Sequence, residues 1–374
     1  MSGIYIHIPF CKKACHYCNF HFSTSRKYQD EMIAAIASEL RYRSAYLNGQ
    51  QVESIYFGGG TPSLLTQAQL DKLLNNIAAE FSVNPDSEVT LEANPDDLSL
   101  DYLNMLGRLG VNRLSIGIQS FFEDDLKWMN RSHNASQAEA CLVEAQHAGF
   151  DNINVDLIFG CPTSSDRRWQ QNLEKALFYD IPHLSCYGLT VEPQTALEKM
   201  IAKEKTAPPR DEDYAHQFEM TMNYLISEGY HHYEISNYAR EGCISRHNSS
   251  YWKAQSYLGV GPSAHSFDRD RRRWNISHNI QYMKAIREGK PAFEEEVLTD
   301  KDRFNEYLLT GLRTSWGCEE AELRELNHSY FKEFEKEVDH VIEAQLLSYD
   351  GGVFRLTNQG KLLANDVISR LFVV

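Results

Sequence analysis

The sequence predicts an α/β protein with a parallel β-sheet, followed by a small helical module. Short runs of β-branched and aromatic residues alternate with helical patterns up to about residue 200, as expected of βαβ units. Beyond that point the alternation stops and the chain later turns helical. The 374 residues are 42% hydrophobic and 24% charged, which is ordinary for a globular protein and sufficient for a buried core.

Six strands are expected, each followed by a helix. The expected strands are 4–10, 53–58, 88–94, 112–119, 152–159 and 183–190. The expected helices are about 27–46, 67–82, 100–109, 136–148, 166–178 and 211–228. Ser99 is a suitable N-cap for the third helix, and Gly110 follows its end. Six such units fit a partial barrel or a doubly wound sheet, because a complete barrel usually needs about 250 residues.

The C-terminal part has a different pattern. Residues 231–290 are rich in Tyr, Asn, Ser and Arg and are expected to be irregular. Helices are expected at 300–314, 319–325, 329–345 and 358–371, with a hairpin turning at Asp350-Gly351-Gly352. Helices and a hairpin in this order predict a winged-helix-like module. We therefore expect three regions: a core over 1–230, a connecting region over 231–296 and a C-terminal domain over 297–374.

Charge and hydropathy exclude several classes of protein. A net charge of -15 disfavours binding to nucleic acid, and residues 291–374 contain 9 Lys and Arg against 17 Asp and Glu. The sequence contains no run of about 18 apolar residues, so no membrane span is expected. The start, MSGIYIHIPF, lacks the basic and long apolar regions of a secretory signal, so a cytoplasmic location is expected.

Three of the eight cysteines crowd together after the first strand. Cys11, Cys15 and Cys18 have the spacing CxxxCxxC, whereas the other five are scattered and are expected to pack as small buried hydrophobes. Three thiolates on one loop can hold three irons of a [4Fe–4S] cluster. The alternatives are three free thiols, or a zinc site completed by His16 or His21.

A cluster with three cysteines has one iron without a protein ligand. Clusters that only transfer electrons usually carry four cysteines, whereas an open iron can bind the amino and carboxylate groups of S-adenosylmethionine. An electron passed to the sulfonium then cleaves that molecule, and the protein holds the parts in place. The cysteine spacing therefore predicts a [4Fe–4S] cluster and S-adenosylmethionine as cofactors.

Polar residues and glycines recur near the ends of the expected strands, where open α/β sheets and barrels bind ligands. The run Gly58-Gly59-Gly60-Thr61-Pro62 follows the second strand and allows a ligand to approach the backbone, although a tight turn explains it equally well. Glu92 ends the third strand and Gln119 the fourth. Asp156 interrupts an apolar run, where an unpaired carboxylate is costly to bury.

Several motifs together resemble the radical S-adenosylmethionine proteins of the HemN/HemW family. They are IYIHIPFCKKACHYC, YFGGGTP, LEANPDD, SIGIQSF, MNRSH and VDLIFGCP, and the likeness runs from residue 4 to about 374. The resemblance implies a partial (β/α)6 barrel over 1–230, with the cluster loop after its first strand. It also implies a HemN-type C-terminal domain over 297–374.

The resemblance also implies individual ligand roles. The residues that would line the cluster-bound S-adenosylmethionine are Tyr5, Gly59, Gly60, Thr61 and Glu92. Tyr17 would pack beside the cluster. The residues matching positions that hold a second S-adenosylmethionine in the decarboxylating enzyme are Gln119, Arg131 and Asp156.

Two departures separate the chain from the coproporphyrinogen dehydrogenases of this family. Those enzymes read CxxxCxxCxC, but the last position here is Phe20, and only four residues precede Tyr5 where they carry an N-terminal extension. Both departures match the HemW branch, whose members are regarded as haem chaperones. A third feature is the segment 246–252, RHNSSYW, which resembles the HNxxYW haem-binding motif of that branch.

The haem motif offers His247 as an iron ligand, with Tyr251 and Trp252 to stack on the porphyrin. On spacing alone, a histidine with neighbouring aromatic residues more often reflects ordinary packing. His265 is an alternative ligand. Arginines near it could bind haem propionates or could equally form a solvated rim: Arg269, Arg271, Arg272 and Arg273.

The resemblance therefore implies a haem chaperone that holds a [4Fe–4S] cluster, S-adenosylmethionine and haem and that delivers haem to respiratory haem proteins. A homodimer and peripheral contact with membrane proteins are compatible with that reading, and nucleic acid is not expected as a partner. The first rival is oxygen-independent decarboxylation of coproporphyrinogen III, and the second is a radical enzyme with another substrate. Whether S-adenosylmethionine is cleaved in the working cycle stays open.

Overall fold

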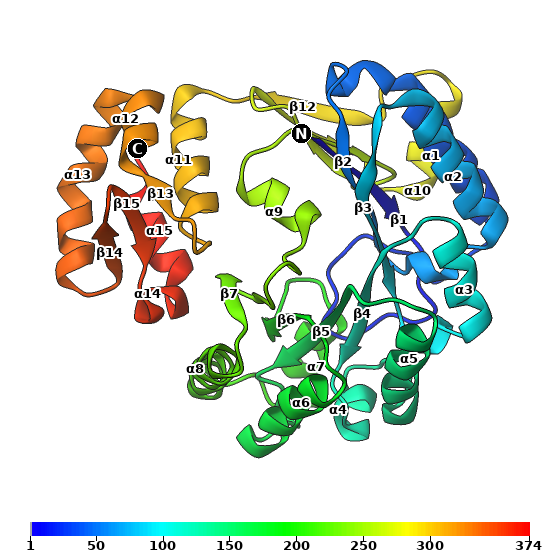
Figure 1. The fold of residues 1–374 in the computed structure, drawn as a ribbon, viewed down its shortest axis with the longest axis horizontal. Helices are drawn as coiled ribbons and strands as arrows, with labels where there is room; N and C mark the ends of the chain where they lie inside the picture. The colour runs from blue at the N-terminus through cyan, green and yellow to red at the C-terminus, as the bar shows by residue number, and fades with distance from the viewer. Residues whose placement is uncertain (1) are drawn as a thin grey trace.

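Six parallel strands form the centre of a curved 12-stranded sheet (Figure 1). The computed structural model describes residues 2–374. The six strands are β1 (Ser2–Ile8), β2 (Val52–Gly59), β3 (Val83–Ala93), β4 (Arg113–Gln119), β5 (Ile153–Phe159) and β6 (His183–Gly188). Each pairs in parallel with the next strand along the chain. The carboxyl ends of all six therefore meet at one rim of the sheet.

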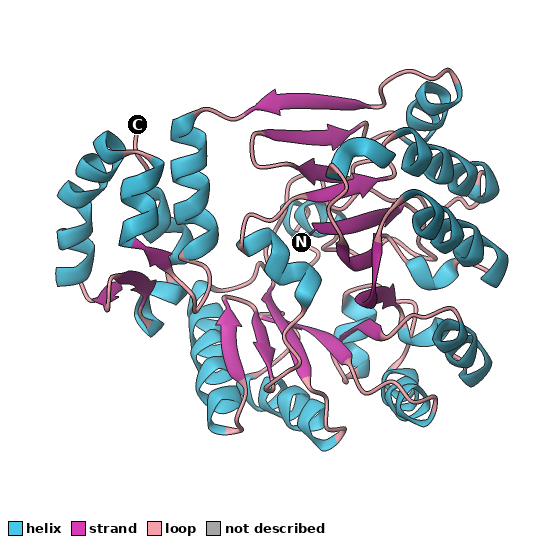
Figure 2. Cartoon of the chain, turned by 45° about the horizontal axis from the view of Figure 1, so that its top comes forward, coloured by secondary structure: helices cyan, strands magenta, loops and turns pink. Residues whose placement is uncertain are grey.

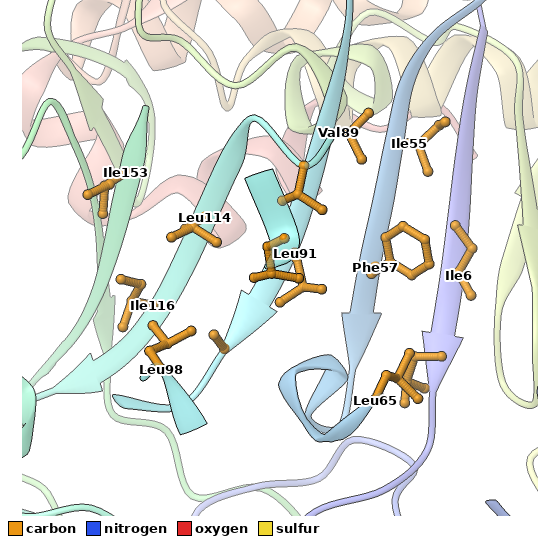
Figure 3. Close-up of a cluster of buried hydrophobic side chains, with 14 of the residues drawn as sticks. Ile6, Ile55, Phe57, Leu65, Val89, Leu91, Leu98, Leu114, Ile116 and Ile153 are labelled. Carbon is orange, nitrogen blue, oxygen red and sulfur yellow. The ribbon is translucent and has the colours of Figure 1, made fainter. Parts of the chain in front are cut away.

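Helices cover the convex face of this sheet. They are α1 (Gln29–Tyr42), α2 (Gln67–Glu80), α3 (Leu100–Arg108), α5 (Ala135–His147), α6 (Asp166–Phe178) and α8 (Asp211–Ser227). The short helices α4 (Glu123–Trp128) and α7 (Ala196–Ala202) lie outside the core between those helices and the sheet, and Leu197 of α7 packs in a separate small cluster with Met129 and Leu189. Strand residues such as Ile55, Phe57 and Leu91 lie in one buried cluster with apolar residues of the helices (Figure 3). Burial of each such side chain contributes about 1.5–3 kcal/mol, so this layer stabilises the barrel.

Successive side chains of a strand point to opposite faces of the sheet. The apolar side chains take the face that the helices cover, so the concave face is the more polar one. In β2, Ile55 and Phe57 point to the helices, whereas Ser54 and Tyr56 point inward. Figure 2 shows the strands curving around this inner face without closing. The arrangement is the partial barrel implied by the resemblance, so the doubly wound alternative is wrong.

Residues 231–297 extend both edges of the sheet. Strands β8 (Asn237–Ala239) and β7 (His231–Glu234) add antiparallel to β6. Beyond β1 follow β9 (Tyr257–Val260), β10 (His265–Phe267), β11 (Arg271–Asn275) and β12 (Phe293–Val297). The expectation of irregular structure over 231–290 is therefore wrong. These strands have only three to five residues, too few for a clear alternation of apolar and polar side chains.

Two helices occur within that same stretch. Helix α10 (Asn279–Arg287) packs against α1 on the outside of the sheet. Helix α9 (Arg246–Trp252) instead contacts β1 and β2. In Figure 1, α9 lies in the middle of the open barrel, on the side of the sheet away from α1 and α2. The segment that resembles a haem motif thus packs inside the barrel.

The C-terminal residues build a second hydrophobic core with residues such as Phe304, Phe334 and Phe354. Its helices are α11 (Asp300–Gly311), α12 (Glu320–Leu326), α13 (His328–Glu343), α14 (Asn358–Leu362) and α15 (Ala364–Leu371). Its small sheet contains β13 (Cys318–Glu319), β14 (Leu347–Asp350) and β15 (Val353–Leu356). The hairpin turns at Gly351 and Gly352 as expected, and both have positive φ. The last helix is broken at Leu363. Within residues 2–374, no helix is long and apolar enough to span a bilayer.

Candidate functional site

A cavity of about 440 Å³ opens where the six parallel strands end. Most of the residues singled out from the sequence line it: Cys11, Cys15, Tyr17, Cys18, Gly59, Gly60, Thr61, Glu92, Gln119, Arg131 and Asp156. They come from the ends of four strands, β2 to β5, from the loop between β1 and α1, and from the segment between α4 and α5. Their convergence follows from the parallel topology, which brings strand ends that are distant in sequence to one rim.

The loop that carries the three cysteines is held on several sides. Lys12 forms ion pairs with Asp96, at 2.7 Å, and with Asp97. The backbone N–H of His16 donates to the carbonyl of Met129 at 3.0 Å. The amide of Asn130 donates to the carbonyl of Ala14 at 2.8 Å. These contacts tie the loop to the segments that follow β3 and β4.

The three cysteines are unpaired and partly exposed, and all line the one cavity. Thr61 donates to Sγ of Cys11 at 3.4 Å, and Arg131 donates to Sγ of Cys15 at 3.3 Å. Burial raises the pKa of the Cys11 thiol to about 11, so iron would displace a bound proton there.

Three free thiols on one loop that line the same cavity fit a cubane, which takes each thiolate on a different iron. A zinc site instead takes its ligands on one ion. His16, one proposed fourth zinc ligand, hydrogen-bonds through Nδ1 with the carbonyl of Trp128 at 2.6 Å.

Gly59 and Gly60 are required by packing against the cluster loop. A Cβ at Gly60 would lie 2.7 Å from the carbonyl oxygen of Phe10 and 2.8 Å from that of Ile8. Gly59 has φ of 107°, and a Cβ there would lie 2.6 Å from the ring of His7. Backbone atoms cannot move aside cheaply, so the glycines let β2 end directly against the loop.

Glu92 joins the cavity to the barrel interior. Its Oε2 accepts the N–H of Gly59 at 3.1 Å, and its Oε1 accepts the hydroxyl of Tyr56 at 2.9 Å. Burial and the nearby charge of Asp156 raise the pKa of Glu92 to about 7, although both hydrogen bonds oppose the shift. The carboxyl group therefore titrates near neutrality.

Gln119 and Asp156 lie on adjacent strands at the cavity wall. Gln119 is nearly buried and has a positive φ of 67°, a strained conformation for a residue with a side chain. Asp156 accepts a hydrogen bond from the amide of Asn154 at 2.8 Å. Burial raises the pKa of Asp156. Asp156 lies in an apolar run and therefore needs a polar partner, and Asn154 is that partner.

Four of the expected ligand residues do not line the cavity: Tyr5, His247, Tyr251 and Trp252. Tyr5 points into the barrel, where its hydroxyl lies 3.2 Å from Nδ1 of His7 and its ring stacks with Tyr56. His247 is 1% exposed. Its ring stacks on Tyr56 with centroids 4.9 Å apart.

Both ring nitrogens of His247 are engaged. Nδ1 forms a hydrogen bond with the hydroxyl of Ser54 at 2.8 Å, and Nε2 forms one with the hydroxyl of Tyr251 at 2.7 Å. Burial, and then the positive charge of Arg113, lower the pKa of His247 to about 3, so the ring is neutral. In this arrangement neither nitrogen has a free lone pair directed to solvent.

The start of α9 is held by a buried carboxylate. Glu88 of β3 accepts the backbone N–H groups of Arg246 and His247, each at 3.0 Å. Ser245 caps the helix by accepting the N–H of Asn248. A buried acid at a helix N-terminus both satisfies free N–H groups and interacts favourably with the helix dipole. Helix α9 is therefore anchored to the barrel wall at its first turn.

The arginine-rich strand β11 pairs with glutamates of its neighbours. Arg271 and Arg273 both bind Glu295, at 3.0 Å and 2.5 Å. Arg272 forms an ion pair with Glu306 of α11. His265 is exposed near this rim. These ion pairs give three of the four arginines a partner within the protein, so no bound propionate is needed to explain them.

Other residues that line the cavity were not singled out from the sequence. Asn94 follows Glu92 at the end of β3, Ser115 and Gly117 occupy inward positions of β4, and Tyr187 lies near the end of β6. Inward alternation near the carboxyl end of each strand could have identified them. Phe20 lines the mouth and is 68% exposed.

Known proteins resemble the chain over its whole length. Residues 5–176 match the Radical SAM superfamily model. The haem chaperone HemW of Bacillus subtilis (strain 168) is 35% identical over 371 residues, covering 98% of both chains. The haem chaperone HemW of Mycobacterium tuberculosis (strain ATCC 25618 / H37Rv) is 33% identical, covering 99% of this chain and 94% of its own.

The fold resembles a solved structure. Coproporphyrinogen III oxidase (HemN) from Escherichia coli, a radical SAM enzyme, superposes with a TM-score of 0.87 at 24% identity, covering 100% of this chain and 90% of its own. That likeness confirms the expected fold class: an α/β partial barrel with a small C-terminal domain. The full-length identity to HemW proteins goes further, and the chain belongs to the HemW family of the radical S-adenosylmethionine superfamily.

Proposed function

We propose that the protein is a haem chaperone that binds a [4Fe–4S] cluster and S-adenosylmethionine at the strand-end cavity and binds haem through the HNSSYW segment. The observation that carries the proposal is the combined position of two features. Three cysteines line one cavity with Glu92 and Arg131, and the segment with His247 packs inside the same barrel. Full-length identity to proteins named as HemW haem chaperones supports the choice of cargo.

Cys11, Cys15 and Cys18 would hold the cluster, which would supply an electron to bound S-adenosylmethionine. The protein's own part is to exclude water and to fix the ligand. Glu92 offers a carboxylate to the positively charged ligand. Thr61 and Arg131 donate to cysteine sulfurs and so hold the thiolates in place.

Haem would bind at α9 once His247 has left its two hydroxyl partners. A neutral imidazole is the form that ligates iron, and the lowered pKa keeps His247 in that form. Tyr251 and Trp252 are both partly exposed and offer aromatic faces. An iron ligand that must first leave its hydrogen-bond partners, as His247 must, suits a protein that holds its cargo temporarily. The recipients would be haem proteins of the respiratory chain.

The test is anaerobic reconstitution followed by measurement of iron, sulfide and haem. We expect about four iron and four sulfide per chain, as a cubane requires. Cys15→Ala should lose the cluster and Cys141→Ala should keep it, because Cys141 is buried in α5 away from the cavity. Haem should bind near one per chain and should be lost or weakened in His247→Ala.

Delivery is tested by transfer of haem from the loaded protein to an apo-cytochrome in membranes. Wild-type protein should transfer haem, and the two variants His247→Ala and Cys15→Ala should not. Conversion of coproporphyrinogen III under strong reductant is measured in parallel. We expect none, because Phe20 stands where the dehydrogenases have a cysteine. Stoichiometric zinc without iron, or haem transfer by His247→Ala at the wild-type rate, would contradict the proposal.

A further inference from the structure

Arg131 lies against the cysteine loop rather than pointing freely into the cavity. Its Nη1 donates to Sγ of Cys15 at 3.3 Å and to the hydroxyl of Tyr17 at 3.2 Å. Its Nη2 donates to the side-chain oxygen of Asn94 and to the carbonyl of Gly117, both at 2.7 Å. A guanidinium carries five N–H groups in a fixed fork, so four of the five have acceptors.

The surrounding backbone fixes this position. The N–H of Arg131 donates to the carbonyl of Leu126 at 2.9 Å, after a turn at Asn130 with φ of 58°. A Cβ at Gly117 would lie 3.2 Å from Nη2 of Arg131, so the glycine leaves room for the guanidinium. Only Nε of the side chain lacks a partner within residues 2–374, and it is buried.

A fixed positive charge with an N–H donor on a cysteine sulfur favours the more negative state of a cluster. Hydrogen bonds to the sulfurs and net charge are among the factors that set the reduction potential of iron–sulfur clusters. The effect is strongest where water is excluded, because the local dielectric is low. We propose that Arg131 tunes the cluster, making its one-electron reduction more favourable. The inference rests on the cluster binding proposed above.

This role differs from contact with a second S-adenosylmethionine, which the family resemblance implies for Arg131. A residue that only holds a nucleoside leaves the potential of the cluster unchanged when no nucleoside is present. A residue that donates to Cys15 changes the potential in the absence of any ligand. Measurements without S-adenosylmethionine therefore separate the two roles.

The experiment is a potentiometric titration of the anaerobically reconstituted protein with dithionite and redox mediators, followed by EPR. Arg131→Gln should reduce about tenfold less readily, which lowers the midpoint by about 59 mV for one electron. Arg131→Lys keeps the charge but cannot reach all four acceptors, so its shift should be smaller. Lys27→Gln is the matched control in the same loop and should stay near wild type, because Lys27 is exposed, screened by solvent and outside the cavity.

Iron content is measured for every variant. If Arg131→Gln holds the full cluster at the wild-type midpoint, or if Lys27→Gln shifts it equally, the inference is overturned. If Arg131→Gln fails to hold a cluster, Tyr17→Phe decides. That change removes the other acceptor of Nη1 and should raise the midpoint, whereas an unchanged or lowered midpoint overturns the inference. A wild-type protein without a cluster contradicts the proposed function instead.

Discussion

Glu92 is the residue whose charge depends most directly on pH near neutrality. Its pKa is raised from 4.5 to about 7, so the carboxyl group is mostly protonated below that value and ionised above it. S-adenosylmethionine carries a positive sulfonium, and an ionised Glu92 attracts it. We therefore expect affinity for S-adenosylmethionine to increase as the pH rises from about 6 to about 8, by at most tenfold per unit.

The measurement is a titration followed by the EPR signal of the reduced cluster at each pH. Glu92→Gln is the matched variant, because it keeps the size of the side chain and a carbonyl acceptor but cannot ionise. Its affinity should be weaker and flat over the same range. A wild-type affinity that falls with rising pH would rule out ionised Glu92 as a ligand.

At the residue scale, the sequence predicted the side chains whose spacing, or whose position at a strand end, indicates a chemical role. The cysteine triplet and Glu92 could be found in this way, and they line one cavity. The contact of Arg131 with Cys15 could not, because the two are 116 positions apart. The ring of His7 beside Gly59 was likewise hidden, since a glycine run gives no sign of what packs against it.

Helix α9 is the element whose docking opposes the proposed haem ligation. Ser54 lies on the barrel wall and holds Nδ1 of His247 at 2.8 Å. A neutral hydrogen bond of this kind contributes about 1 kcal/mol. When a binding-competent state is only partly populated, affinity rises with its population. Ser54→Ala should therefore tighten haem binding, by about fivefold, whereas His247→Ala should weaken it.

Absorbance titration with haem measures both variants side by side. Ser63→Ala is a suitable control, since Ser63 is a buried serine that binds Asp97 rather than His247. Unchanged or weaker haem binding by Ser54→Ala would mean that the docked helix does not compete with haem.

At the element scale, the pattern predicted the six strands and the helices that follow them, with ends displaced by a few residues. The expected helix 100–109 is α3 (Leu100–Arg108), and Ser99 caps it by accepting the N–H of Tyr102. The short helices α4 and α7 and the strands of residues 231–297 were missed. The place of these strands in the sheet is set by pairing of β9 with β1 and of β8 with β6. Pairing between residues so distant in sequence leaves no local signal.

Across the whole molecule, the cavity and α9 are joined through one tyrosine. The hydroxyl of Tyr56 donates to Glu92, and its ring stacks on His247. S-adenosylmethionine bound to Glu92 competes for that carboxylate and loosens Tyr56. We therefore expect S-adenosylmethionine to tighten haem binding by about fivefold, and haem to tighten S-adenosylmethionine binding equally, because coupling is reciprocal.

The coupling is measured by haem titration with and without S-adenosylmethionine. Tyr56→Phe keeps the ring on His247 but removes the hydroxyl, so its haem affinity should no longer respond to the nucleoside. Equal coupling in wild type and Tyr56→Phe would show that the two sites communicate by another route, or through the cluster itself.

Strand β12 is one of the two edges of the 12-stranded sheet, and an exposed edge is open to pairing with another chain. Its sequence contains three consecutive glutamates, 294–296, all exposed. Glu295 pairs with Arg271 and Arg273, whereas Glu294 and Glu296 form no ion pair within residues 2–374. Two such edges aligned antiparallel would bring these charges together and repel. The charge on this edge thus disfavours the end-to-end joining of sheets from two copies.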